Sequence, residues 1–543
     1  MTAVQEQTPP LSDMLRIAFA AYAAHDYENT ARLAEIAARH YPDSIDAWML
    51  LCTALGRLGS VDEERAIERA LRHVPRNHKA WLILQTNRAN ALSKLGRAND
   101  AVTILRSIES DPRLDAKQRD VVGAAYAQSG LFEDALKHCE ASVTAEPNYP
   151  PGLYNYATAL RYLGRLDESE AVFERLLELA PEHSLALASL AAVKKWTPQR
   201  NHIERFRAEL ERTPADSDAR ARLHYSLFKE LHDVKAQPEE AWRELKAGAD
   251  LCRKLYPFSL EKKTAYVDTL INTYNKERLA RRSSHTPAPP KPIFVLGLPR
   301  SGTTLTERIL ASHSRVTAMG ETTGFQVAMR QALNILQKSE LDANAVLESA
   351  ALDWSKIAQS YQRETSYLAG SAEIVTEKLP HNYEAVGPIS LAFPDAPIIH
   401  VRRSPMDSLF GAYKIMFGES AFTWSYSLED LAANYRLYRR LMRHWAEALG
   451  ERLHVVTLEQ LIATPEQEIR KLLEFCQLSF EDACLSPHES SGGVSTASSS
   501  QVRAPINSEG VGAWRRYAEQ LEPLRAALER DAFVDPSGDP IWD

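Results

Sequence analysis

Hydrophobic positions in residues 11–200 recur with helical spacing, and short turns interrupt them at regular intervals. The turns are 34, 37, 34 and 34 residues apart and lie at His25, Gly59, Gly96, Gly130 and Gly164. Prolines follow the turns by 16 or 17 residues, at Pro42, Pro75, Pro112, Pro147 and Pro181. Glycine supplies a positive φ between two helices, and proline ends the second helix. The pattern therefore predicts a series of helix–turn–helix units.

A period near 34 residues is typical of tetratricopeptide repeats, and residues 11–200 resemble such an array. The resemblance implies an α-solenoid with a concave groove for a peptide or partner protein. Residues 201–280 keep a helical pattern but lose the repeat phase, which predicts degenerate repeats or capping helices. Residues 1–10 are polar and contain prolines, so we expect a disordered N-terminus.

The pattern changes after a proline-rich stretch, residues 281–292, which we interpret as a linker. Short apolar runs then predict strands at 293–296, 373–376, 397–401 and 453–457. Helical runs fall between them, at about 305–312, 325–337, 383–392, 405–416, 428–448 and 465–475. This alternation predicts a parallel β-sheet flanked by helices, so the fold class is α followed by α/β. We expect the α/β domain to span 293–530, with a C-terminal tail at 531–543.

A glycine-bounded loop follows the first of these strands and reads Gly297-Leu-Pro-Arg-Ser-Gly-Thr-Thr304. The glycines allow a tight turn, and the amides that open the next helix suit a tetrahedral oxyanion. Arg300 adds a planar cation beside the hydroxyls of Thr303 and Thr304. The ATP-binding P-loop has the same glycine spacing but carries a lysine where Thr303 stands, and no lysine occurs between residues 292 and 337. The loop is therefore P-loop-like but suited to a different phosphate ligand.

The run Gly297–Leu305 resembles the 5'-phosphosulfate-binding loop of the sulfotransferase family. Over about residues 290–530 the chain is similar to protein-tyrosine sulfotransferases and to bacterial sulfotransferases that carry tetratricopeptide repeats. The resemblance implies a transferase that uses 3'-phosphoadenosine 5'-phosphosulfate as its co-substrate and needs no metal. It assigns donor binding to the loop residues Pro299, Arg300, Ser301, Gly302, Thr303 and Thr304.

Two further segments resemble parts of the family that carry catalytic residues. Met319-Gly-Glu-Thr322 is similar to a Gly-Glu-Glu-Thr segment, so Glu321 aligns with the base that takes the acceptor proton. Gly320 replaces the first glutamate of that pair, and the segment offers one carboxylate. Lys378 belongs to a Lys-x-Pro segment and would join Arg300 in neutralising charge on the leaving group. His381, three residues after the lysine, is a rival base.

The donor's 3'-phosphate is assigned, by the same resemblance, to the segment that begins at Val401-Arg-Arg-Ser-Pro405. Arg403 aligns with the family arginine, and Arg402 is its neighbour. The family's phosphate-binding serine is replaced by Gly411, for which Ser408 or Lys414 could compensate. The small polar stretch 492–505 resembles a lid over the donor, with Ser498 supporting the leaving group and Arg503 meeting the 3'-phosphate.

Composition excludes several classes of function. The net charge of −8 argues against a general nucleic-acid binder, and no apolar run reaches the roughly 18 residues of a membrane span. The first residues do not show the basic segment followed by an apolar one that is typical of a signal peptide. We therefore expect a cytoplasmic protein. Five scattered cysteines without a CxxC pair favour free thiols over a metal site.

The acceptor stays open on sequence alone, because a tyrosine of a peptide or protein and a small phenol, sugar or lipid hydroxyl all fit. The aromatic stretch of Phe422, Trp424 and Tyr426 suits either an acceptor pocket or the core. Two other functions are compatible with the motifs. One is a phosphoryl-transfer enzyme with a modified P-loop. The other is a repeat scaffold with an inactive or regulatory sulfotransferase-like domain, for which Gly411 is the sequence hint.

Overall fold

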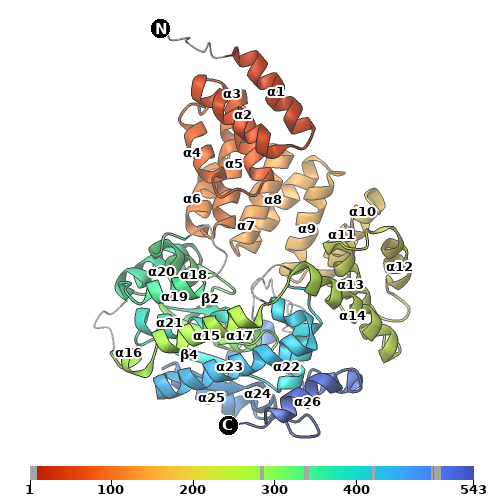
Figure 1. Ribbon diagram of the computed structural model, residues 1–543, viewed down its shortest axis with the longest axis vertical. Helices are drawn as coiled ribbons and strands as arrows, with labels where there is room; N and C mark the ends of the chain where they lie inside the picture. Colours follow the sequence, from red (N-terminus) through yellow and green to blue (C-terminus); the bar gives the residue numbers. More distant parts are fainter. Residues whose placement is uncertain are drawn as a thin grey trace. The chain divides into compact units, whose positions relative to one another are not determined.

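The computed structural model describes residues 9–281, 287–335, 341–418, 422–490, 493 and 503–542. The chain divides into two compact units, Met1–Tyr156 and Ala157–Asp543 (Figure 1). The helices of the first unit are α1 (Leu11–Ala23), α2 (Tyr27–His40), α3 (Ile45–Arg57), α4 (Glu63–Leu71), α5 (Lys79–Lys94), α6 (Ala98–Ile108), α7 (Ala116–Gln128) and α8 (Phe132–Ala145). Helix α9 (Pro150–Tyr162) spans the division between the units.

The first unit consists of helices that pack against their neighbours in the chain, α1 on α2, α3 on α4, α5 on α6 and α7 on α8. Small and apolar side chains such as Ala34, Trp48 and Ile67 fill the space between the first of these helices. The predicted turn residues all adopt a positive φ, between 60° and 79°, at His25, Gly59, Gly96, Gly130 and Gly164. As predicted, the five prolines follow the ends of helices, namely α2, α4, α6, α8 and α10. The predicted helix–turn–helix repeats are therefore confirmed.

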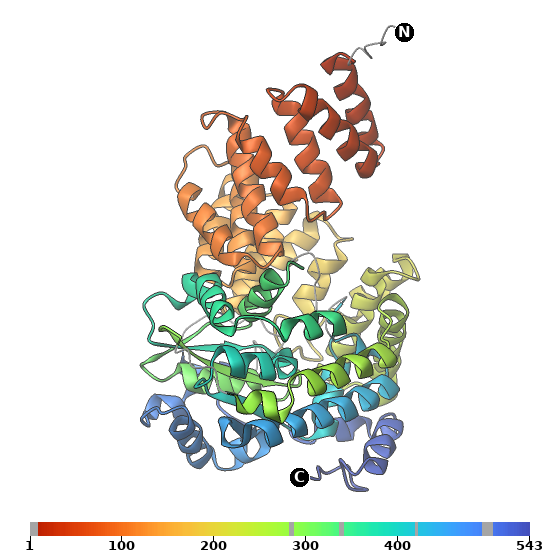
Figure 2. The same ribbon diagram turned by 60° about the vertical axis from the view of Figure 1, so that its left-hand side comes forward.

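The second unit begins with further helices: α10 (Leu166–Leu179), α11 (Ser184–Ala191), α12 (Ile203–Arg212), α13 (Asp218–Asp233), α14 (Pro238–Leu255), α15 (Leu260–Thr273) and α16 (Lys276–Ala280). A loop at residues 192–202 joins α11 to α12 and carries an isolated bridge between Thr197 and Arg200. Helix α13 packs against α11, α12 and α14, and α15 packs against the later helix α23 (Leu428–Leu449). Figures 1 and 2 both show α15 and α23 side by side.

A five-stranded parallel sheet forms the centre of the second unit, in the order β2-β3-β1-β4-β5. The strands are β1 (Lys291–Gly297), β2 (Val316–Ala318), β3 (Ile374–Lys378), β4 (Ile398–Arg402) and β5 (Leu453–Thr457). The predicted parallel α/β arrangement is therefore confirmed, and four of the strands match the apolar runs. The sequence missed β2, which has three residues and buries one of them, Val316.

Helices cover both faces of the sheet, which explains why β1 is apolar at consecutive positions. Ile293 and Val295 pack with Ile309 of α17 (Thr303–Ala311) and Leu472 of α25 (Pro465–Phe475) on one face. Phe294 points to the other face, where its ring lies 5.7–6.2 Å from those of three aromatic residues, Phe325, Tyr361 and Phe393. The remaining helices are α18 (Gly324–Ala332), α19 (Ala343–Ser349), α20 (Trp354–Ala369), α21 (Val386–Ala392), α22 (Pro405–Tyr413), α24 (Leu458–Ala463) and α26 (Glu522–Arg530).

Helices α19 and α20, which the sequence pattern did not predict, lie between β2 and β3. The described residues contain no helix that combines the length and apolarity of a membrane span. All five cysteines are buried and form no disulfide.

Candidate active site

The loop between β1 and α17 is shaped by three residues with positive φ. Gly297 has φ +153°, and a Cβ there would lie 2.2 Å from the carbonyl oxygen of Val401 on the neighbouring strand, so only glycine fits. Arg300 has φ +69° and Gly302 has φ +103°. Helix α17 begins at Thr303, so the amide groups of its first turn face the loop. The sequence therefore folds into an anion-binding turn at the carboxyl end of β1.

A cavity of about 920 Å³ lies against this loop, within the second unit. The site residues predicted from sequence that line it are Pro299, Arg300, Gly302, Thr303, Thr304, Glu321 and Arg403. Other cavity residues are Leu166 at the start of α10, Lys194 and Lys195 in the loop between α11 and α12, and residues near the C-terminus such as Ala504 and Val511. The cavity therefore brings together segments that are far apart in the chain.

Three basic side chains, which we name the cationic cluster, line this cavity: Arg300, Arg403 and Lys414. Burial, and then the charge of Arg403, lower the pKa of Arg300 to about 10. Burial, followed by the charges of Arg300 and Arg403, lowers the pKa of Lys414 to about 8. Like charges that line one buried cavity repel one another unless an anion lies between them. The cluster therefore suits a ligand with several negative charges.

Arg403 is held in the cluster by backbone contacts. It donates to the carbonyl oxygens of Arg300, at 3.1 Å, and of Gly510. Its guanidinium lies 3.8 Å from a carboxylate oxygen of Asp407. The other carboxylate contacts of Asp407 come from the amides of Gly512, at 2.7 Å, and Trp514, at 3.4 Å. Arg403 and Asp407 thus connect the loop to the C-terminal segment.

Gly411 leaves room for the side chain of Arg300. A Cβ at position 411 would lie 2.9 Å from the Cβ and 3.2 Å from the Cγ of Arg300. A serine there would push the arginine out of its place or strain its backbone, which already has a positive φ. Packing against Arg300 therefore explains the glycine at position 411. Its presence does not by itself indicate that the phosphate-binding site has been lost.

Glu321 and Lys378 form an ion pair beside the cavity. The ammonium of Lys378, fully buried at the end of β3, donates to a carboxylate oxygen of Glu321, whose side chain is 35% exposed. The amide of Lys378 also donates to the carbonyl oxygen of Gly320 at 3.0 Å. The carboxylate therefore faces the cavity with its partner cation behind it.

An aromatic cluster, His381, Phe417 and Phe422, lines the same cavity. The ring of Phe422 lies 4.8 Å from that of Phe417 and 5.8 Å from that of His381. Burial lowers the pKa of His381, and its Nδ1 has no hydrogen-bond partner among the described residues. Trp424 and Tyr426 are buried and do not line the cavity, so this part of the aromatic stretch belongs to the core.

The structure places several predicted site residues elsewhere. Ser301, Arg402 and Ser408 border a second cavity of about 240 Å³, which Arg403 also touches. Arg402 donates to the hydroxyl of Thr457 at 2.9 Å and lies 4.4 Å from the ring of Trp542. Ser498 lies outside the described residues.

Arg503 contacts a repeat turn instead of the cavity. It donates to the carbonyl oxygen of Tyr162 at 2.9 Å, and its guanidinium fills the space above Gly164, where a Cβ would lie 2.4 Å from its Cζ. Arg516 likewise donates to the carbonyl oxygens of His232 and Ala236, at 2.7 and 2.6 Å. The C-terminal segment therefore joins the helices before the sheet to the cavity.

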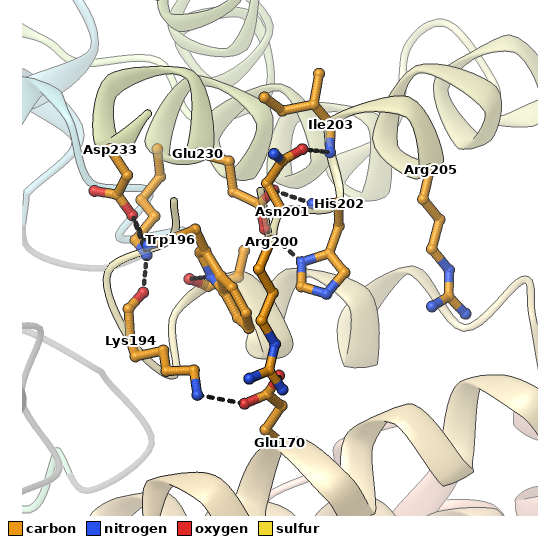
Figure 3. A network of polar contacts seen from close by, with 12 residues as sticks. Glu170, Lys194, Trp196, Arg200, Asn201, His202, Ile203, Arg205, Glu230 and Asp233 are labelled. Carbon is orange, nitrogen blue, oxygen red and sulfur yellow. Dashed lines mark hydrogen bonds and ion pairs between the residues drawn. The ribbon is translucent and has the colours of Figure 1, made fainter. Parts of the chain in front are cut away.

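A polar network holds the loop that brings Lys194 to the cavity (Figure 3). Lys194 lies 2.6 Å from a carboxylate oxygen of Glu170, and the amide of Trp196 donates to Asp233 at 3.1 Å. His202 contacts the buried carboxylate of Glu230 at 2.8 Å. Burial opposes the charged ring, yet hydrogen bonds to Glu174 and Glu230 raise the pKa of His202 to about 9. The loop is therefore a fixed wall of the cavity.

Sequence reasoning missed this wall, the aromatic Phe417 and the buried Glu307 of α17. The lysines of the wall belong to a repeat whose pattern carries no signal for a distant site. Glu307 stands four residues after Thr303, and this helical spacing is the one signal that could have placed it below the loop. In the described part of the chain, no group of three or more His, Cys, Asp or Glu residues is arranged to hold a metal.

Residues 292–482 match the family model described as the Sulfotransferase family, and residues 126–193 match that of the tetratricopeptide repeat. An uncharacterized protein of Aquifex aeolicus (strain VF5) is 29% identical over 376 residues, which cover 68% of this chain and 49% of that protein. This chain thus spans about half the length of that relative.

Protein-tyrosine sulfotransferase 1 of Danio rerio is 28% identical over 264 residues, which cover 45% of this chain and 73% of that protein. A solved structure, the sulfotransferase domain from the curacin biosynthetic pathway, aligns with 19% identity and a TM-score of 0.27 over 44% of this chain and 99% of that chain. This protein therefore combines tetratricopeptide repeats with a C-terminal sulfotransferase-family domain.

Proposed function

We propose that the protein transfers a sulfuryl group from 3'-phosphoadenosine 5'-phosphosulfate to a hydroxyl acceptor. The observation that carries this proposal is the cationic cluster beside a P-loop-like turn that has no lysine. A donor with phosphate groups on both sides of its ribose matches several cations at one cavity better than ATP with its magnesium does. The family match over residues 292–482 supports the same donor.

In this proposal the residues of the loop and the cationic cluster bind and orient the donor. The amides at the start of α17 and the side chain of Arg300 hold the 5'-phosphosulfate. Arg403 holds the 3'-phosphate, with Lys414 as a further cation. Arg402 is not part of this set, because it borders the second cavity and, unlike Arg403, does not line the first.

The chemical step is a direct transfer in which Glu321 is the base. Glu321 takes the proton of the acceptor hydroxyl, whose oxygen forms a bond to sulfur. The bond between sulfur and the bridging oxygen breaks, and the electron pair leaves with 3',5'-diphosphoadenosine. Once protonated, Glu321 no longer holds Lys378 by charge, so the lysine becomes available to the departing oxygen. Arg300 stabilises the same developing charge.

We propose a phenolic acceptor, such as the tyrosine of a peptide or protein. The aromatic cluster offers flat apolar surface next to Glu321, which suits a ring that carries its hydroxyl outward. The tetratricopeptide repeats offer a surface for a partner or peptide acceptor.

Transfer of radioactive sulfate tests this function. The full chain is incubated with the labelled donor and with tyrosine peptides, small phenols, sugars and a lipid alcohol, in the presence of a chelator. We expect label on the phenols and peptides and none with the Glu321→Gln variant. Calorimetry should detect binding of 3',5'-diphosphoadenosine. Tight magnesium-dependent binding of ATP without binding of that nucleotide would replace the proposal with a phosphoryl-transfer enzyme.

A further inference from the structure

Glu307 is a buried carboxyl group that contacts the turn carrying the proposed base. It lies on α17, whose first turn forms part of the anion-binding loop. One carboxylate oxygen accepts from the amide of Gly320 at 3.0 Å and from the hydroxyl of Thr376 at 3.3 Å. The Gly320 amide immediately precedes Glu321 in the chain. Glu307 therefore ties the turn that carries Glu321 to the helix that begins at the loop.

Glu307 also interacts with Glu321 and Lys378 through charge. Burial raises the pKa of Glu307 to about 7; Lys378 opposes this shift and Glu321 adds to it. Glu307 and Glu321 thus both interact with Lys378, which donates its hydrogen bond to Glu321 in the structure. A charge on Glu307 repels the charge on Glu321, which makes proton transfer to Glu321 more favourable.

The charged groups that reach Glu307 come from three elements: Lys378 and Glu377 from β3, Glu321 from the turn after β2, and Arg308 from α17 itself. Arg308 donates to the carbonyl oxygen of Pro487 at 3.0 Å, on the side of α17 that contacts the short helix Pro487–Glu489. From β1, the buried Ile293 and Val295 pack with α17. The charges that act most on the pKa of Glu307 are therefore those of Lys378 and Glu321.

We propose that Glu307 is a positioning residue for the transfer, which holds the Gly320–Glu321 turn and shares Lys378 with Glu321. It supplies from a helix the second carboxyl group that the turn lacks because position 320 is glycine. This inference rests on the proposed function. Its consequence is that turnover rises as Glu307 loses its proton, because the ionised form strengthens Glu321 as a base.

The Glu307→Gln variant tests the inference, because glutamine keeps an acceptor oxygen for the Gly320 amide but cannot ionise. We expect kcat to fall about 10-fold at the alkaline end and to lose its rise between about pH 6 and 8, while both KM values stay within about twofold. Glu377→Gln is the matched control, because Glu377 is also buried, has a pKa raised by burial to about 8 and is bonded to Asn382 instead of Gly320. We expect this control to keep the neutral-pH rise. A wild-type pH profile in Glu307→Gln, or the same loss in Glu377→Gln, would overturn the inference.

A second measurement separates this inference from the proposed function, because it needs no turnover. Infrared spectroscopy of the full chain follows buried protonated carboxyl groups during a pH titration. We expect a band that titrates near pH 7 and is missing in Glu307→Gln, beside a second band from Glu377 that is missing in Glu377→Gln. In Glu321→Gln the Glu307 band should titrate at lower pH, since the variant removes a charge that raises the pKa of Glu307. An unchanged titration in Glu321→Gln contradicts the coupling, whether or not the protein transfers sulfate.

Discussion

The cationic cluster and the aromatic cluster line one cavity but are organised differently. The cations, Arg300, Arg403 and Lys414, lie on or next to the phosphate loop and the segment after β4. Backbone contacts fix Arg403, which donates to the carbonyl oxygens of Arg300 and Gly510. The aromatic side chains follow β3 and α22 and are held by contacts between rings. Charge at fixed positions suits a donor that does not vary, and ring contacts suit an acceptor chosen by shape.

Glu321 lies beside both clusters, and removing its charge should have the largest effect. We expect Glu321→Gln to lower kcat by about 1,000-fold, because the acceptor hydroxyl then lacks its base. Binding of 3',5'-diphosphoadenosine, measured by calorimetry, should not weaken, because Glu321 pairs with Lys378 and is itself outside the cationic cluster. The control is Glu509→Gln, an acid that also lines the cavity and should keep full turnover. If Glu321→Gln transfers sulfate at the normal rate, His381 becomes the base to examine.

Arg403 and Arg402 offer the next test, because the structure separates two adjacent arginines. We expect Arg403→Ala to weaken binding of 3',5'-diphosphoadenosine by about 10- to 100-fold, the effect of losing a charge-assisted contact to phosphate. Arg402→Ala should change this affinity less than about threefold, since its side chain packs on Trp542 and Thr457. Equal losses in the two variants would show that the donor reaches both cavities. Circular dichroism of both variants checks that each one folds.

This pair of arginines also shows how far the sequence could lead. The repeats, the parallel sheet and the anion-binding loop follow from periodicity and from residues that are adjacent in the chain. The motif indicated both arginines as donor ligands. Consecutive side chains at the end of a strand lie on opposite faces of the sheet, so only one of the two could be expected to face the donor. Helical spacing could have placed Glu307 near the loop, but not its contact with Gly320, and nothing indicated the contact of Lys194 with Glu170, because packing of separate elements brings these partners together.

Substitutions in the aromatic cluster should have smaller effects, and these should concern the KM of the acceptor. We expect Phe422→Ala to raise the KM of a phenolic acceptor about 5- to 10-fold, because the variant removes ring contacts of about 1 kcal/mol or more. The affinity for 3',5'-diphosphoadenosine should not change. Phe422→Leu is the matched control, since it keeps apolar volume and should recover part of the loss. An unchanged acceptor KM in Phe422→Ala would remove the aromatic cluster from acceptor binding.

The smallest effect we expect is the uptake of a fraction of a proton when the donor product binds. In the protein without ligand, burial and the neighbouring arginines lower the pKa of Lys414 to about 8. An anion bound in the cationic cluster favours the charged lysine and raises its pKa, so binding near pH 8 takes up about half a proton. The affinity therefore falls as the pH rises above about 8, because the lysine must be protonated before it can help.

Calorimetry of 3',5'-diphosphoadenosine in two buffers with different ionisation enthalpies measures this uptake directly. Two variants sharpen the result: Lys414→Met removes both the cation and the uptake, whereas Lys414→Arg keeps a cation that does not titrate in this range. We expect both variants to lose the uptake and only Lys414→Met to bind more weakly at pH 7. The nearby charges that act on Lys414 are Arg300, Arg403, Asp407 and Asp233, and none of their ordinary pKa values lies near 8. Proton uptake that persists in Lys414→Met would therefore have to come from outside the cationic cluster, and Lys414 would lose its place in donor binding.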